Sequence, residues 1–175
     1  MYIDILGARY YDNLDIESIC INVKSAFNLE VLFRKTVLDF GITFDANRLQ
    51  YNSTQILQIL LNSGKIKNDS KTILLTDLDL FVSILTHVFG EAELNGRVAV
   101  ASSHRLHSEY YGLPKNIDLL QERITKEIIH ELGHTFGLLH CKYSNCVMQS
   151  STYVEDIDLK GMALCNSCKS QIIIV

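Results

Sequence analysis

The sequence predicts an α/β domain built around a mixed β-sheet, in two or three layers. Strand and helix patterns alternate in the order strand, helix, strand, helix, strand, hairpin, helix, and an irregular tail follows. The hairpin adds an antiparallel strand to strands that are separated by helices, so a purely doubly wound sheet is not expected. At 175 residues the chain has the length of one domain with a small appendage.

The first elements follow from alternation and helical spacing. Residues 2–7 alternate and predict a strand, and residues 29–37 predict a second strand. Between them lies a predicted helix that Asp12 or Asn13 would cap. Its apolar residues recur at helical spacing: Ile16, Ile19, Val23 and Phe27.

The middle of the chain predicts a second helix between strand candidates. Residues 52–64 form the helix, with Asn52 or Ser53 as the cap and Gly64 at the end. The runs 71–79 and 83–89 are apolar and rich in β-branched residues, which favours strands.

A hairpin and a long helix come next. Asn95 and Gly96 stand between two alternating runs, so residues 89–94 should pair antiparallel with residues 97–102. Asn116 should cap the helix, which Gly137 ends. The tail has weak periodicity, with a short strand expected at 170–175. The helix carries an apolar stripe formed by Ile117, Leu120, Ile124, Ile128 and Leu132.

Charge and hydropathy disfavour two classes of protein, those that bind nucleic acid and those that span a membrane. A formal charge of −4 disfavours non-specific nucleic-acid binding, which needs a basic face. The N-terminus lacks the pattern of a signal peptide, and no uncharged apolar run has the length of about 20 residues that spans a bilayer. We therefore expect a cytoplasmic protein without nucleic-acid or membrane partners, and we take a monomer as the working expectation.

The stretch HELGHTFGLLHC, residues 130–141, concentrates metal-binding side chains. His130 and His134 are four residues apart, so a helix places both on one face, within reach of one ion. Gly137 can turn the chain so that His140 approaches as a third ligand. A chance HExxH pattern in an amphipathic helix is the alternative, and the added glycine and histidine make it much rarer.

Three neutral imidazoles would leave the full charge of a zinc ion and one open position. Such an ion lowers the pKa of a bound water to about 7 and polarises a carbonyl. Glu131 would take the proton from this zinc-bound water and pass it to the leaving amine. This arrangement suits the hydrolysis of amide bonds.

Four of the five cysteines form two pairs, Cys141 with Cys146 and Cys165 with Cys168. Four thiolates would close a tetrahedral shell around a second, structural zinc ion and leave no site for water. Unligated buried thiols, or one mixed site shared with His140, are the alternatives. Disulfides are disfavoured in a reducing compartment, and Cys20 is expected in the core.

Residues 130–168 resemble the archaemetzincins, a family of metzincin zinc metallopeptidases. The matching features are HExxHxxGxxH, the cysteine that directly follows the third histidine, Met148, and the run LCNSCK. The resemblance implies a metzincin-like fold: a mostly parallel twisted sheet with an antiparallel edge strand, a backing helix and an active-site helix. It also implies a boundary between an N-terminal subdomain, residues 1–137, and a small zinc-bound subdomain, residues 138–175, with Met148 in a Met-turn. An ordinary core role for Met148 is the alternative.

The resemblance further implies an edge strand that binds substrate. Glu91, Ala92 and Glu93 lie in the predicted edge, although acidic residues also blunt solvated edges. Tyr153 is a weak candidate for stabilising an oxyanion. His104 and His107 are expected on the surface, and turn or capping roles are expected for Asp77 and Asp79.

Two functions compete on the sequence. The first is a metallopeptidase that acts on peptides or proteins with two zinc ions. The second is a zinc-stabilised module that binds an extended chain with little or no turnover. The sequence shows neither an anchor for a free amino terminus nor a restraint on activity, so cleavage position and regulation stay open.

Overall fold

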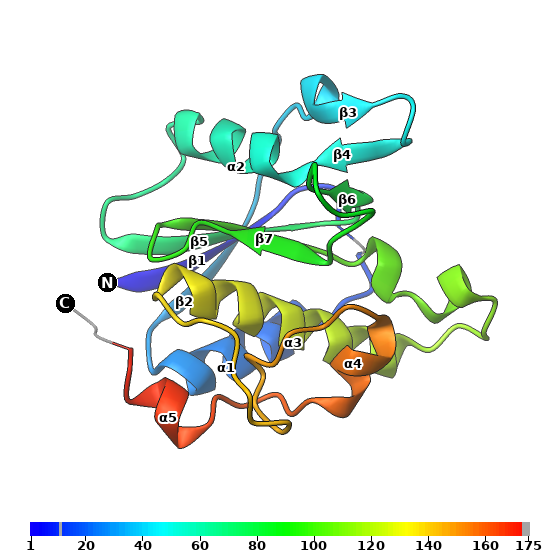
Figure 1. Cartoon of the computed structure of the whole chain (residues 1–175). Helices are drawn as coiled ribbons and strands as arrows, with labels where there is room; N and C mark the ends of the chain where they lie inside the picture. Colours follow the sequence, from blue (N-terminus) through cyan, green and yellow to red (C-terminus); the bar gives the residue numbers. More distant parts are fainter. Residues whose placement is uncertain (11, 173–175) are drawn as a thin grey trace.

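The computed structural model describes residues 1–10 and 12–172. Its main sheet has five strands in the order β2, β1, β5, β8, β7 (Figure 1). The first four strands are parallel, and β7 runs antiparallel to β8 at the edge. The strands are β1 (Tyr2–Gly7), β2 (Val31–Lys35), β5 (Ser70–Thr76), β7 (Gly90–Ala92) and β8 (Val98–Ser102). The predicted mixed α/β fold with an antiparallel edge strand is therefore confirmed.

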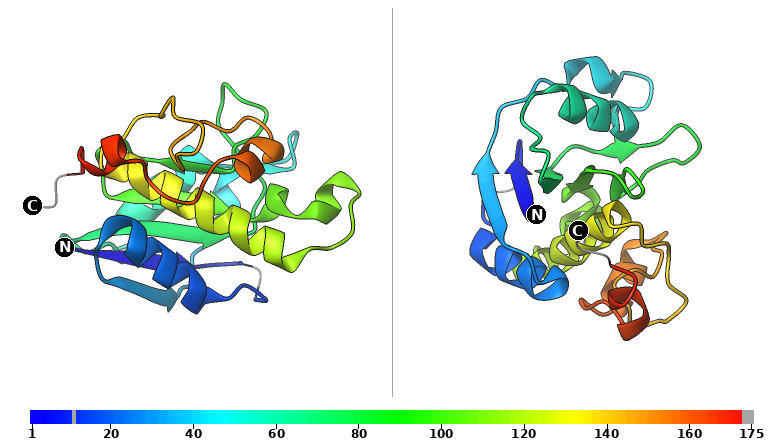
Figure 2. Two further views of the ribbon diagram at one scale, coloured as in Figure 1. Left: turned by 90° about the horizontal axis from the view of Figure 1, so that it is seen from below. Right: turned by 90° about the vertical axis from the view of Figure 1, so that its left-hand side faces the viewer.

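Helices cover both faces of this sheet. Helix α2 (Ser53–Asn62) lies on one face, and α1 (Ile16–Phe27) and α3 (Ile117–Thr135) lie on the other (Figures 1 and 2). Both faces are buried, as parallel strands require. The C-terminal segment carries the short helices α4 (Val154–Leu159) and α5 (Asn166–Lys169) and packs on the far side of α3 (Figure 2).

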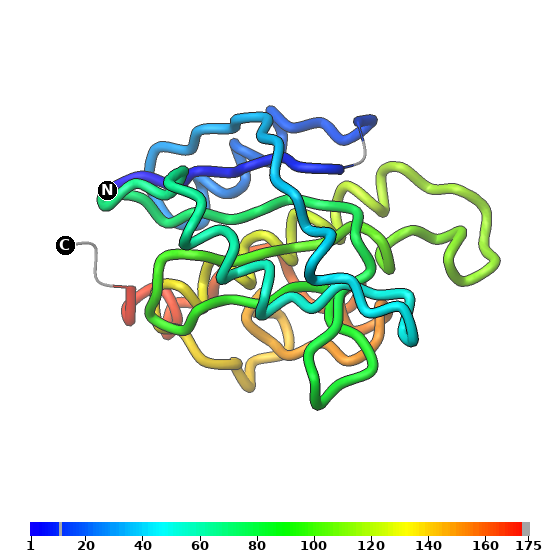
Figure 3. Tube along the Cα trace, turned by 90° about the horizontal axis from the view of Figure 1, so that it is seen from above, coloured from blue at the N-terminus to red at the C-terminus, as the bar shows by residue number. Residues whose placement is uncertain are grey.

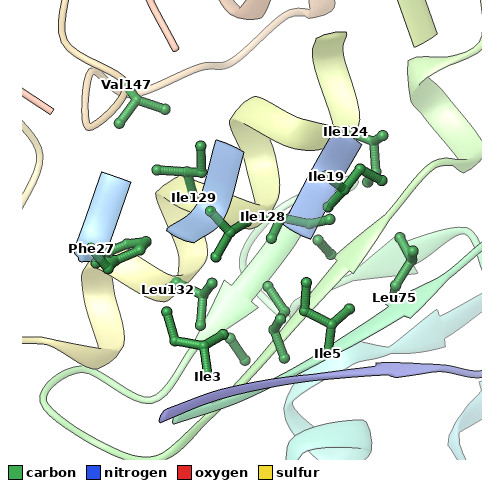
Figure 4. Close-up of a cluster of buried hydrophobic side chains, with 14 of the residues drawn as sticks. Ile3, Ile5, Ile19, Phe27, Leu75, Ile124, Ile128, Ile129, Leu132 and Val147 are labelled. Carbon is green, nitrogen blue, oxygen red and sulfur yellow. The ribbon is translucent and has the colours of Figure 1, made fainter. Parts of the chain in front are cut away.

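Alternation along the strands divides the core into two clusters. Ile73 and Leu75 of β5 face α1 and α3, whereas Leu74 faces α2. Figure 4 shows the first cluster, where Ile128 and Leu132 of α3 meet Ile3 and other strand residues. This cluster also includes Val147 and Met148 from the C-terminal segment. The boundary at residue 137 stays a prediction.

The cap of α1 was predicted wrongly. The helix begins at Ile16, and Asp15, not Asp12 or Asn13, accepts a hydrogen bond from Ser18 N at 3.0 Å. Asn52 caps α2 and Asn116 caps α3, as expected. The helical spacing of the apolar residues did not show which of the polar residues Asp12, Asn13 and Asp15 caps the helix.

A second, three-stranded sheet was not predicted. It consists of β3 (Phe44–Asp45), β4 (Gln50–Asn52) and β6 (Leu80–Phe81) in the order β3, β4, β6. Strands of two or three residues are too short to show a period of two. Short 3-10 turns at Gly41–Thr43, His104–Leu106 and Ser108–Tyr111 complete the described elements.

Two strand predictions need correction. The run 83–89 forms a loop with Ile84 exposed, and only Val88 makes an isolated bridge, to Leu80. Residues 170–172 form no strand, and residues 173–175 of that prediction lie outside the described residues. The hairpin prediction kept its register, since Glu91 faces Val100, although β7 is only three residues long.

Candidate active site

Helix α3 and the turn after it bring three histidines together. His130 and His134 lie on one face of the helix with ring centroids 4.7 Å apart. Gly137 follows the helix with a φ of 88°, and the chain turns back so that the His140 ring lies 5.0 Å from that of His134. One ring nitrogen of each histidine lies within 4.8 Å of the others.

Backbone carbonyls fix the tautomers of the two helical histidines. His130 Nδ1 lies 2.8 Å from Val147 O, and His134 Nδ1 lies 2.7 Å from Leu138 O. Each Nδ1 must therefore carry the proton, which leaves both Nε2 atoms as acceptors. These two Nε2 atoms face each other at 3.1 Å. Two ligands of a tetrahedral zinc ion lie about 3.3 Å apart when each bond is about 2.0–2.1 Å, so the donor set fits zinc.

The surroundings keep the imidazoles neutral. Burial, followed by the nearby Lys160 cation, lowers the pKa of His130 well below its ordinary value. Burial also lowers the pKa of His134 and His140. Neutral imidazole is the form that binds a metal ion.

Glu131 and the three histidines line a cleft of about 370 Å³. The Glu131 side chain is buried, and this burial, followed by the Glu127 charge, raises its pKa well above the ordinary range. A carboxylate with a raised pKa is suited to exchanging protons near neutral pH. The cleft is lined by residues 85–92, by Glu127, His130, Glu131 and His134 of α3, and by His140, Ser150, Ser151 and Thr152.

Gly90 gives Glu131 its space. A Cβ atom at Gly90 would lie 2.6 Å from Glu131 Cγ, 2.8 Å from its Oε1 and 2.6 Å from Val100 O. The edge strand thus runs directly over the carboxylate. Sequence reasoning missed Gly90, because nothing in the sequence shows that the strand and the helix approach so closely.

We expect Gly90→Ala to reduce kcat/KM by about 10²-fold, because a carboxylate displaced by about 1 Å no longer meets its partner atoms. Steady-state peptide hydrolysis measures this effect. Gly41→Ala is the control, since it adds the same methyl group at a glycine that does not line the cleft. Equal activity of the two variants would show that the close approach at Gly90 has no catalytic consequence.

Met148 lies beneath the histidines and is fully buried. A Cβ atom at Gly133 would lie 2.4 Å from Met148 Sδ, so this glycine lets the sulfur contact the helix between His130 and His134. Met148 O accepts a hydrogen bond from Cys141 N at 2.9 Å, which ties the turn to the start of the cysteine segment. These contacts fit hydrophobic support and not ligation.

The edge strand differs in detail from the sequence prediction. Glu91 and Ala92 line the cleft, but Glu93 does not. The Glu91 carboxylate accepts hydrogen bonds from the hydroxyl groups of Ser53 and Thr54 at the start of α2. Glu93 accepts from Arg97 N at 3.0 Å inside the hairpin. Both acidic side chains are therefore engaged within the protein.

Four cysteine sulfur atoms form a separate cluster. All five cysteines lie among the described residues, and none forms a disulfide. Cys141 Sγ lies 3.8 Å from Cys165 Sγ, and Cys146 Sγ lies 3.7 Å from Cys168 Sγ. Ligands of a tetrahedral zinc ion with bonds of about 2.3 Å lie about 3.8 Å apart. A backbone hydrogen bond from Cys168 lowers the pKa of Cys165 to about 7, whereas burial raises the pKa of Cys146 and of Cys168.

A buried ion pair beside the cleft was also missed. Lys160 Nζ lies 2.9 Å from Glu127 Oε1, and the two side chains are 0% and 4% exposed. Glu127 precedes Glu131 by one turn of α3 and could have been suspected from that spacing. Lys160 lies in the weakly periodic tail, where the sequence gives no partner.

We expect Lys160→Met to lower the free energy of unfolding by about 3–5 kcal/mol, because it leaves the Glu127 carboxylate buried without a counter-charge. Urea unfolding of the zinc-loaded protein measures the loss. The double variant Lys160→Met with Glu127→Gln removes both charges and should recover part of it. A single variant as stable as the wild type would contradict the buried pair.

Other candidates lie away from the cleft. Tyr153 is 67% exposed and is not among the residues that line it. His104 contacts Asp77 O, and His107 lies near Glu109. Asp79 forms an ion pair with Arg105 at 2.6 Å, where a turn or capping role was expected.

Comparison with known proteins agrees with this geometry. The model of peptidase family M54 matches residues 10–173. The archaemetzincin of Natronomonas pharaonis is 32% identical over 99% of this chain and 100% of its own length. The archaemetzincin of Saccharolobus solfataricus is 35% identical over 98% of this chain and 93% of its own.

A solved structure shows the same similarity. The crystal structure of archaemetzincin from Archaeoglobus fulgidus, complexed with malonate, superposes with a TM-score of 0.81 at 34% identity and covers 98% of this chain and 100% of its own. The family match extends well beyond the histidine and cysteine motifs. The chain therefore belongs to peptidase family M54, the archaemetzincins, and is a metallopeptidase.

Proposed function

We propose that the protein hydrolyses peptide bonds with one zinc ion held by His130, His134 and His140, and with Glu131 as general acid and base. The observation that carries this proposal is the pair of Nε2 acceptors facing each other at 3.1 Å beside a buried carboxylate. Without a cation or a proton between them, two such lone pairs repel each other. A second zinc ion, bound by Cys141, Cys146, Cys165 and Cys168, is proposed as structural.

In the proposed hydrolysis, the zinc ion and the side chains of the protein have different roles. Bound zinc would supply the Lewis acidity that polarises the scissile carbonyl and acidifies the attacking water. Glu131 accepts a proton from that water as the new C–O bond forms. It then donates the proton to the amine as the C–N bond breaks. Burial of the carboxylate supports this exchange, because it weakens the preference for the charged form.

The substrate is proposed to add to β7 as a further strand. Phe89 O and Glu93 N form hydrogen bonds with β8. In an antiparallel ladder, the alternate residues Gly90 and Ala92 then present their main-chain groups to the outside. A peptide can pair with them while passing over Glu131. Glu91, Ala92 and Glu93 remain part of this proposed binding edge, and the carboxylates of Glu91 and Glu93 also accept hydrogen bonds within the protein.

Substrates, membranes and nucleic acids are the partners to consider. Family membership implies peptide or protein substrates. Of the helices that the structure describes, none has the length and hydropathy to cross a membrane. The acidic balance of the chain supports our proposal that it binds no nucleic acid. A cytoplasmic location and a monomeric state are proposed as well.

A broad peptide library separates hydrolysis from mere binding. We expect the zinc-loaded protein to generate new peptide termini, detected by mass spectrometry. A chelator should abolish cleavage, and added zinc should restore it. Peptides that bind without any cleavage would instead support the alternative function, a zinc-stabilised binding module.

A further inference from the structure

An exposed apolar loop precedes the edge strand. Residues 83–86, called the apolar loop below, place Ile84 at 89% and Leu85 at 51% exposure. In Figure 3 the green segment that includes this loop projects from the body of the molecule. Large apolar side chains that lie next to each other on the surface often mark a binding site.

The apolar loop is held in place by its backbone. Arg48 Nη1 donates to Leu85 O at 3.0 Å, and Gln50 Nε2 donates to Thr86 O at 3.1 Å. Leu85 N also donates to Val82 O at 3.0 Å, which closes a turn. The guanidinium of Arg48 in turn lies over the Phe81 ring, 4.5 Å from its centroid. Arg48, between β3 and β4, and Gln50 of β4 thus hold the carbonyl groups of the loop. The side chains of Ile84 and Leu85 stay exposed.

Leu85 and Thr86 of the apolar loop line the cleft. The lining residues continue along the chain without a break through His87 to Gly90 and Ala92 of the edge strand. A peptide that pairs with β7 and extends from Gly90 toward residue 85 therefore reaches Leu85. The same extended ligand would contact a pre-organised apolar surface after it leaves the edge strand.

We propose that the apolar loop determines substrate specificity by binding a large apolar side chain of the polypeptide substrate through Leu85, with Ile84 beside it. The inference rests on the proposed function, because it needs a substrate that lies along β7. Arg48 and Gln50 are positioning residues in this proposal. Their hydrogen bonds lower the conformational cost of presenting the loop to the substrate.

Leu85→Ser tests the proposal in the full-length, zinc-loaded enzyme. We expect kcat/KM for peptides with a large apolar residue at the contacted position to fall about tenfold, mainly through KM. Cleavage profiles of a peptide library with the wild type and the variant identify that position, since its apolar preference should disappear. Peptides with serine there should be cut equally well by both enzymes.

Leu49→Ser is the matched control. Leu49 belongs to the same region of the second sheet and is 71% exposed, but it does not line the cleft. We expect this variant to keep the wild-type profile. Equal profiles for the wild type, Leu85→Ser and Leu49→Ser would overturn the proposal, as would equal losses in both variants.

Arg48→Met tests the positioning of the apolar loop. It removes the hydrogen bond to Leu85 O and keeps an apolar stem over Phe81. We expect KM to rise for the apolar peptides alone, with kcat and the cleavage of the serine peptides unchanged. A uniform loss on all peptides would show a merely structural role and contradict the positioning. If the wild type cut no peptide at all, the proposed function would fail, which is a separate outcome.

Discussion

Glu131→Gln should reduce kcat by about 10²–10⁴-fold while both metal sites keep their zinc. The amide nearly matches the carboxylate in size, so it fits beneath Gly90, but it cannot accept a proton from water. None of the three histidines is altered, and zinc binding should therefore persist. Steady-state hydrolysis and metal analysis of the same preparation measure the two effects.

Asp118→Asn is the control for this substitution. Asp118 lies in the first turn of the same helix, and its side chain is exposed. The change from carboxylate to amide there should leave kcat close to the wild-type value. Undiminished peptide cleavage by Glu131→Gln would refute its assignment as general base. Loss of zinc together with activity would point instead to a structural role.

Cys168→Ser should lower the melting temperature by about 10 °C and remove one zinc ion per chain. A ligand present at about 1,000 times its Kd stabilises the folded state by about 4 kcal/mol, and each kcal/mol corresponds to about 2–4 °C for a chain of this size. Cys168 is buried and belongs to the core cluster that includes α3, so loss of the ion loosens the C-terminal segment. Thermal unfolding with metal analysis measures both changes.

Cys20→Ser separates the cluster from thiols in general. Cys20 lies on α1, outside the four-sulfur cluster, and its side chain is partly exposed. We expect this variant to keep its zinc and to melt within a few degrees of the wild type. A Cys168→Ser protein with unchanged zinc content and melting temperature would contradict the structural metal.

The spacing of residues in the sequence predicted the part of the site that is formed by α3 and the turn after it. His130 and His134 meet because they are one helical turn apart, and His140 returns because Gly137 adopts a positive φ. The register of the hairpin followed from Asn95 and Gly96 in the same way. Such features need only the geometry of neighbouring residues.

Contacts between distant segments could not be predicted in this way. Lys160 meets Glu127 across 33 positions of sequence, and Gly90 of β7 approaches Glu131 of α3. The apolar run 83–89 satisfied the pattern of a strand, yet hydrogen bonds from Arg48 and Gln50 hold it as a loop. In each case the partner lies far along the chain, where a single sequence carries no signal.

We propose that an open, catalytic metal site and a closed, structural one lie side by side, with His140 in the first and Cys141 in the second. Zinc content per chain, measured for the wild type, His130→Ala and Cys168→Ser, tests the presence of two separate sites most directly. We predict two ions in the wild type and one in each variant. One ion in the wild type and none in either variant would show a single mixed site and contradict it.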